Sequence, residues 1–236
     1  MNKLEETKQI GNLILDTSDI SIGRFKACST SSSKQKLQVI KDEMKFTYDI
    51  STNFISVTLQ LGNGKYILKL FEHVTKKKYL TRCQTELDVE LENRYEPYLH
   101  SNVYVDYENF MDLEMFVKNT FALYDHDEVF ERVKKYFLRG YSYDYVKSFL
   151  VKSGELPDIQ RCFEKHMGIC QDLAALTVAM FRIAGLPASL EIGYCGKMPH
   201  AWCSVYMNDK WNLYDPTSEI LHKNRKEQDY TVERWY

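Results

Sequence analysis

The sequence predicts an α+β protein in which an N-terminal antiparallel β domain precedes a core of helices and a short antiparallel sheet. The spacing of apolar residues predicts this division. Apolar residues alternate with a period of two between about residues 37 and 92, and their spacing changes toward 3.6 after about residue 110. We therefore expect an N-terminal β-sandwich-like domain at 1–108 and a second domain at 109–236.

A β-hairpin is expected around Asn63-Gly64. Apolar residues occupy every second position of 55–61 and of 66–70, and Asn-Gly between two such segments is typical of a hairpin turn. LDVEL at 87–91 alternates in the same way. These segments predict a small antiparallel sandwich.

Helical spacing is expected in DLEMFVKNTFAL (112–123) and DEVFERVKKYFLRGY (127–141), with Asp125 to Asp127 capping the second helix. SGELPD (153–158) has the composition of a loop, and we expect it to lead directly to a third helix. That helix covers about 171–184, because Gly185 and Pro187 follow it.

Composition limits the classes of partner. The chain has 31 basic and 33 acidic residues, and its net charge of −2 indicates no general attraction to nucleic acid. No apolar run approaches the roughly 18 residues of a membrane span, and the start does not resemble a signal peptide. We expect a cytoplasmic protein with reduced thiols, although a protein secreted after removal of a leader would look the same.

Cys170 is the first candidate for chemistry, because it lies at the start of the third predicted helix. Free N–H groups and the positive end of the helix dipole favour a thiolate there. His200 and Asp215 follow on segments that read as strands, 189–196, 201–207 and 211–215. A thiol, an imidazole and a carboxylate that converge at one sheet edge would form a Cys-His-Asp triad. A buried structural cysteine is the simpler interpretation of Cys170 alone.

A family resemblance rests on these residues. G-x-C-x-D-x-A at 168–174, then Arg182 and GLPAS, HAW at 200–202 and W-x-x-x-DPT at 211–217 resemble the transglutaminase-like superfamily. The resemblance implies a papain-like core and extends more weakly over the whole chain, as in bacterial members. It implies Cys170 as nucleophile, His200 as general acid and base, and Asp215 as the group that orients the imidazole.

The implied function is cysteine-dependent acyl transfer or hydrolysis at peptide or glutamine amide bonds, through a thioester. Hydrolysis is favoured slightly, because nothing in the chain is visibly devoted to a lysine acceptor. Tyr143 and Trp202 are weaker candidates, for a second oxyanion donor and for lining the substrate cleft, although packing explains aromatic residues more simply. The expected partner is a protein or peptide substrate, with no cofactor, metal, nucleic acid or membrane span.

Two other interpretations stay open. The domain could be a non-catalytic binding module that keeps the fold. Alternatively, Cys195, His200 and Cys203 could bind zinc, although their spacing matches no common structural zinc site. In an exported protein, Cys195 and Cys203 could instead form a disulfide across two strands.

Overall fold

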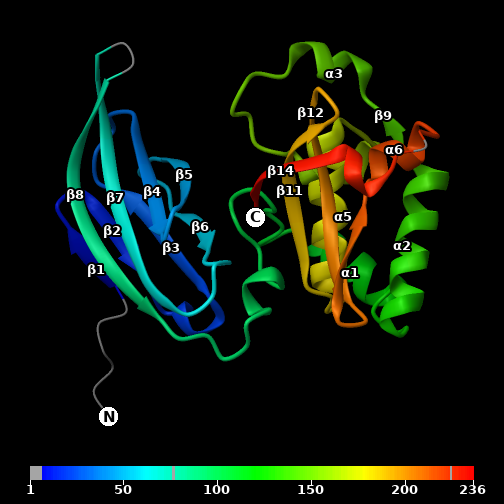
Figure 1. Ribbon diagram of the computed structural model, residues 1–236, viewed down its shortest axis with the longest axis horizontal. Helices are drawn as coiled ribbons and strands as arrows, with labels where there is room; N and C mark the ends of the chain where they lie inside the picture. The colour runs from blue at the N-terminus through cyan, green and yellow to red at the C-terminus, as the bar shows by residue number, and fades with distance from the viewer. Residues whose placement is uncertain (1–6, 76–77, 224) are drawn as a thin grey trace. The chain divides into compact units, whose positions relative to one another are not determined.

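The computed structural model describes residues 7–75, 78–223 and 225–236, and Figure 1 shows their course. Contacts within the chain divide it into two units, Met1–His100 and Ser101–Tyr236. The boundary inferred from the sequence, residue 108, lies shortly after this division. Within the described ranges, no helix combines the length and the apolar character that a membrane crossing requires.

The described part of the first unit contains two four-stranded antiparallel sheets, drawn from blue to cyan in Figure 1. Their orders are β1-β2-β3-β6 and β5-β4-β7-β8. Val39 and Leu68 pair across β4 and β7, and both are buried. The strands are β1 (Thr7–Ile10), β2 (Leu13–Asp16), β3 (Arg24–Ser29), β4 (Gln35–Lys41), β5 (Met44–Ile50), β6 (Ile55–Thr58), β7 (Gly64–Thr75) and β8 (Lys78–Val89), with short 3-10 turns at Ile20–Ile22 and Glu96–Tyr98.

The hairpin expected around Asn63-Gly64 is wrong. β6 pairs with β3, whereas β7 pairs with β4 and β8, so the chain passes from one sheet to the other between them. Val57 and Leu68 are both fully buried, each in a different sheet. Alternation shows which face of a strand is buried, but not which strand is its neighbour. Two consecutive strands that belong to different sheets, as β6 and β7 do, can therefore show the same alternation as the two strands of a hairpin.

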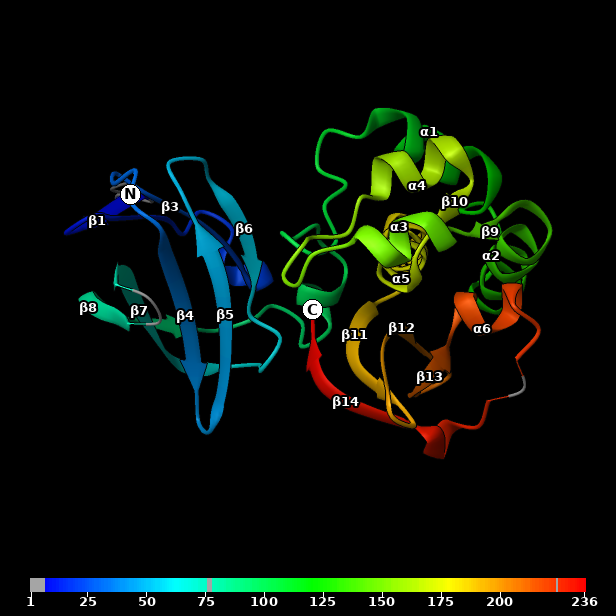
Figure 2. The same cartoon turned by 90° about the horizontal axis from the view of Figure 1, so that it is seen from above.

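The second unit combines helices with an antiparallel sheet of order β13-β12-β11-β14, as expected for the α+β class. Helix α5 packs on β11 and β12, and Figure 2 shows it above these strands. The helices are α1 (Met111–Thr120), α2 (His126–Gly140), α3 (Tyr145–Leu150), α4 (Ile159–Lys165), α5 (Cys170–Ile183) and α6 (Pro216–Ile220); the strands are β9 (Ser142–Tyr143), β10 (Met167–Gly168), β11 (Ala188–Cys195), β12 (Met198–Met207), β13 (Lys210–Tyr214) and β14 (Tyr230–Trp235), with a 3-10 turn at Glu227–Asp229.

Aspartate caps start four of these helices. Each carboxylate accepts a hydrogen bond from the backbone N–H three residues later, which otherwise lacks a partner in the first turn. The distances lie between 2.8 and 3.0 Å. The capping residues are Asp125 of α2, Asp144 of α3, Asp158 of α4 and Asp215 of α6.

The segment before α5 differs from the prediction. A loop is present at 153–158, but it does not lead directly to the third predicted helix, because α4 and β10 lie between. The short helix α3 precedes the loop. With six and seven residues, α3 and α4 are too short for a helical period to stand out in the sequence.

Candidate active site

Cys170 is the first residue of α5, and close packing sets its position. Ile169 before it is extended, and its N–H donates to the Asp172 carboxylate at 3.1 Å. Gly168 leaves no room for a side chain, because a Cβ there would lie 2.8 Å from Cβ of Asp172 and 2.9 Å from Sγ of Cys162. The tight contact between Gly168 and Asp172 thus fixes the backbone at which helix α5 begins, with Cys170 as its first residue.

Asp172 is fully buried, and its carboxylate accepts hydrogen bonds from groups at the starts of neighbouring helices. Its Oδ1 accepts hydrogen bonds from the Asp158 N–H at 2.9 Å and from Nζ of Lys147 at 3.0 Å. Lys147 also lies 2.9 Å from Oδ2. A buried carboxylate needs such partners. Asp172 thus joins the starts of α3, α4 and α5 and fixes the backbone on which Cys170 lies.

His200 and Asp215 come from neighbouring strands of the sheet. His200 is the third residue of β12, and Asp215 directly follows β13, which pairs with β12 through Cys203 and Tyr214. Nε2 of His200 lies 2.7 Å from Oδ2 of Asp215, and both side chains are buried. The structure therefore brings together two of the residues expected from the sequence.

The Cys170 thiol lies near enough to the His200 ring to raise the pKa of the imidazole. Asp215 binds Nε2 of this ring, so Nδ1 is the nitrogen that is not taken by the carboxylate. Burial alone lowers the pKa of His200, but the hydrogen bonds and charges of Asp215 and Cys170 outweigh burial and raise it to about 9. At neutral pH the ring is therefore an imidazolium that faces the Asp215 carboxylate.

Asp215 stays ionised although it is buried. Burial raises the pKa of its carboxyl, but His200 and Ser218 outweigh this effect and hold the pKa below its usual range. Oδ1 accepts from the N–H of Ser218 at 3.0 Å, and Oδ2 from its hydroxyl at 2.5 Å. The Tyr230 hydroxyl donates to Oδ2 at 2.8 Å. These donors fix the carboxylate opposite the imidazole.

Tyr230 and Ser218 are members of the site that sequence reasoning missed. Ser218 follows Asp215 by three residues, which is the spacing of a helix cap and could have been noticed after DPT. Tyr230 begins β14, on the far side of β11 from β12. No local pattern connects a residue of the last strand with Asp215.

Tyr143 and Trp202 lie in different settings. Tyr143 pairs with Gly168 between β9 and β10, so it lies beside the start of α5. Burial raises the pKa of its phenol, and the proximity of Cys170 adds to this shift. The expectation that Trp202 lines a cleft is wrong, because its side chain is fully buried. Its ring packs on Tyr230, with 4.9 Å between the ring centroids, and near His200 at 6.1 Å.

The alternatives that use Cys195 and Cys203 find no support in the geometry. All six cysteines are free thiols. The Cys203 thiol is buried and points to the backbone oxygen of Tyr214, 3.1 Å away, rather than to His200. In the part of the chain that the structure describes, no group of three metal-binding side chains is present.

A comparison with protein families matches the part of the chain that contains the candidate site residues. Residues 117–216, which contain Cys170, His200 and Asp215, match the profile of the transglutaminase-like superfamily. This part of the chain is similar to transglutaminase-like domains. The match supports assignment to the general class of cysteine enzymes, and it agrees with the resemblance in the sequence motifs. A comparison of the whole chain with curated proteins gives no match.

Solved structures show distant similarity to this chain. A candidate cysteine protease from Cytophaga hutchinsonii is 14% identical with a TM-score of 0.46, over 90% of this chain and 88% of that chain. The periplasmic domain of TgpA from Pseudomonas aeruginosa is 13% identical with a TM-score of 0.45, over 92% and 74%. A TGase is 18% identical with a TM-score of 0.42, over 66% and 47%. Similarity at this level transfers no activity, substrate or compartment to the present chain.

Proposed function

We propose that the transglutaminase-like domain catalyses acyl transfer from peptide or glutamine amides through a thioester on Cys170. The arrangement of His200 carries this proposal. Its ring is 2.7 Å from the Asp215 carboxylate, and the nearby Cys170 thiol contributes to its raised pKa. This order of carboxylate, imidazole and nucleophile is what covalent catalysis by a thiol requires.

In the first half of the reaction, the Cys170 thiolate attacks the carbonyl carbon of the amide. A bond forms between Sγ and this carbon, and the carbonyl oxygen takes the negative charge. A backbone N–H at the start of α5 is suited to stabilise this oxyanion, because helix N-termini carry free donors. The C–N bond then breaks as the His200 imidazolium gives its proton to the leaving nitrogen.

In the second half, an acceptor resolves the thioester. Neutral His200 removes a proton from water or an amine, whose oxygen or nitrogen attacks the thioester carbon. The C–S bond breaks, and the sulfur leaves as a thiolate that again faces an imidazolium. We favour water as the acceptor, because no part of the chain is visibly devoted to a lysine.

Asp215 has a positioning role in this scheme. Its carboxylate orients the ring and stabilises the imidazolium, and Ser218 and Tyr230 hold the carboxylate in place. Tyr143 lies close enough to Cys170 to help line the oxyanion site. Trp202, which is buried, contributes packing below the ring of His200.

The proposal is tested by a short pulse of iodoacetamide between pH 5 and 9, with the alkylation rate of each cysteine measured by mass spectrometry. We expect Cys170 to react fastest, to remain reactive well below the ordinary thiol pKa of about 8.5, and to slow in His200→Ala. Cys83, the other thiol that is only half-buried, is an internal control. Equal rates at the two cysteines would contradict an activated thiolate.

Turnover requires a second measurement. A peptide library that contains glutamine is incubated with the wild type and with Cys170→Ala, and release of ammonia and cleavage of peptide bonds are followed separately. Activity that disappears in Cys170→Ala supports the proposed chemistry and identifies the acceptor. Undiminished activity in this variant would show that Cys170 is not the nucleophile, and ligand binding without turnover would favour the binding module.

A further inference from the structure

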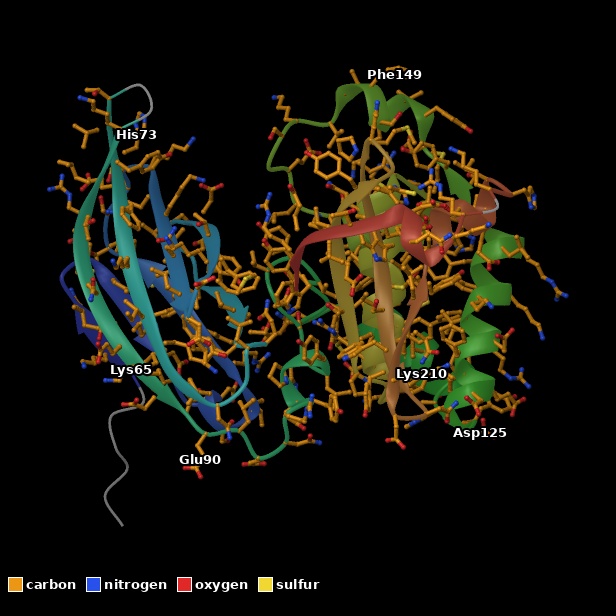
Figure 3. All side chains as sticks on the ribbon, viewed as in Figure 1. Lys65, His73, Glu90, Asp125, Phe149 and Lys210 are labelled. Atoms are coloured by element: carbon orange, nitrogen blue, oxygen red, sulfur yellow. The ribbon has the colours of Figure 1, made fainter. Side chains whose placement is uncertain are left out.

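Helix α3 exposes an unusual number of apolar side chains for its length. Of its six residues, Val146 and Leu150 are each 70% exposed and Phe149 is 87% exposed. Figure 3 labels Phe149, which projects outward from this helix. Contiguous apolar surface of this kind commonly marks a site of interaction. We call the exposed face of α3, with Val146, Phe149 and Leu150, the α3 surface.

A cavity of about 650 Å³ adjoins the α3 surface. Its apolar walls include Val146, Leu150 and Val151, together with Met167 of β10 and the ring of Tyr143. A space of this size can hold a large aliphatic or aromatic side chain. The cavity thus extends the α3 surface inward between α3, the following loop and β10.

Charged side chains also line the cavity, but they already have partners. Lys147 is paired with buried Asp172, and Arg161 donates to Asp144 at 2.8 Å. Asp158 accepts from the backbone N–H of Arg161, and Glu155 from that of Lys152. The ion pairs neutralise Lys147 and Arg161, whereas Glu155 and Asp158 keep their negative charges, because a backbone N–H does not neutralise a carboxylate. With its apolar walls, the cavity therefore suits an apolar group and repels an anionic one.

The walls of the cavity continue to the candidate nucleophile. Tyr143 pairs with Gly168, two residues before Cys170. On the other wall, the backbone oxygen of Glu155 accepts a hydrogen bond of 3.1 Å from Nε2 of Gln171, the residue next to Cys170. An extended peptide advances about 3.3 Å per residue, and walls bonded to residues beside Cys170 allow it to run from the thiol into the cavity.

We infer that the cavity and the α3 surface bind an apolar side chain of the acyl-donor peptide, close to the carbonyl that Cys170 attacks. This inference rests on the proposed function and names its substrate class. The adjacent thiol identifies the occupant as the substrate, because a peptide that presents its carbonyl to Cys170 passes along these walls.

The test uses two peptide chloromethyl ketones, acetyl-Leu-Gly and acetyl-Asn-Gly, which differ only in the uncharged side chain beside the reactive residue. Alkylation of Cys170 is measured with both probes, and with iodoacetamide, which has no side chain to bind. In the wild type we expect the Leu probe to react about tenfold faster than the Asn probe, as burial of one apolar side chain permits. The iodoacetamide rate measures the reactivity of the Cys170 thiol without any contribution from side-chain binding.

The test variant is Val146→Ser with Leu150→Ser, and the control is Met115→Ser with Leu123→Ser. The control residues are also exposed and apolar, and lie on or just after α1. We expect the test variant to reduce the preference for Leu to about twofold, with its iodoacetamide rate unchanged. The control should keep the full preference.

The outcomes separate this inference from the proposed function. Selective iodoacetamide labelling without a preference between the probes would overturn the apolar subsite and leave the nucleophile in place. Loss of selective labelling would overturn both. Sedimentation velocity of the wild type and the test variant tests whether a second copy of the chain occupies the α3 surface instead. Self-association of the wild type that the serine substitutions abolish would contradict the inference.

Discussion

The hydroxyl of Tyr230 donates a hydrogen bond of 2.8 Å to Oδ2 of Asp215, the oxygen that also binds His200. Tyr230 is on β14, so the last strand of the sheet takes part in holding a carboxylate that follows β13. The same ring packs on Trp202. The orientation of His200 thus depends on a residue from the end of the chain.

Replacement of Tyr230 by Phe removes this hydroxyl and keeps the ring. We expect turnover to fall about tenfold with little change in KM, because Asp215 orients the imidazole without touching substrate. Stability should fall by about 1 kcal/mol, the net value of one hydrogen bond. Steady-state kinetics and urea unfolding measure the two effects. Tyr194→Phe on β11, where the tyrosine is 38% exposed, is the control; a KM effect confined to Tyr230→Phe would argue against positioning.

The His200 pair predicts how stability depends on pH. The folded pKa of about 9 lies above the unfolded value of about 6.5, so the contribution is fully present below pH of about 6.5 and is lost as pH rises through 9. The shift corresponds to about 3 kcal/mol at most. The lowered pKa of Asp215 adds stability above about pH 4, which is lost in acid.

Urea unfolding at pH 6, 7.5, 9 and 10 measures this dependence. In His200→Gln, the decline in the free energy of unfolding above pH 7 should be largely absent. The pKa of His200, followed by NMR, should also fall in Cys170→Ala, because the sulfur is one of the groups that raise it. An unchanged pKa in Cys170→Ala would mean that the thiol and the imidazole do not interact.

The three candidate catalytic residues could be predicted because each carries a local signal. Cys170 starts a helix with strong periodicity, and His200 and Asp215 lie beside short apolar strands. Tyr230 could not be found in this way, since its role depends on which strands are neighbours in space. The same lack of neighbour information made 55–70 look like a hairpin, and the brevity of α3 and α4 hid the helices that meet at Asp172.

Asp172 supports the start of α5, so its charge should matter for stability. Asp172→Asn keeps the shape of the side chain but replaces one acceptor oxygen with an amide. This change leaves Lys147 without its full counter-charge and one backbone N–H without an acceptor. We expect a loss of about 2–4 kcal/mol in the free energy of unfolding. Urea unfolding measures it, with Glu114→Gln as a control in an exposed pair with Lys118, expected to cost under about 1 kcal/mol.

Gly168 offers the sharpest test of the packing before Cys170. Gly185 has a positive φ of 87°, but Gly168 does not have a positive φ. Alanine is therefore excluded at Gly168 by lack of space alone. A methyl group at 2.8 Å from Cβ of Asp172 forces the start of α5 to shift. We expect Gly168→Ala to cost about 1–3 kcal/mol and to slow alkylation of Cys170.

Gly140 at the end of α2 provides the matched substitution. A Cβ there would meet nothing within 4 Å, and alanine favours a helix over glycine by about 1 kcal/mol at most. Gly140→Ala should therefore be neutral or stabilising, and should leave the alkylation rate unchanged. If Gly168→Ala were as well tolerated as Gly140→Ala, the contact between Gly168 and Asp172 would not be what positions the thiol.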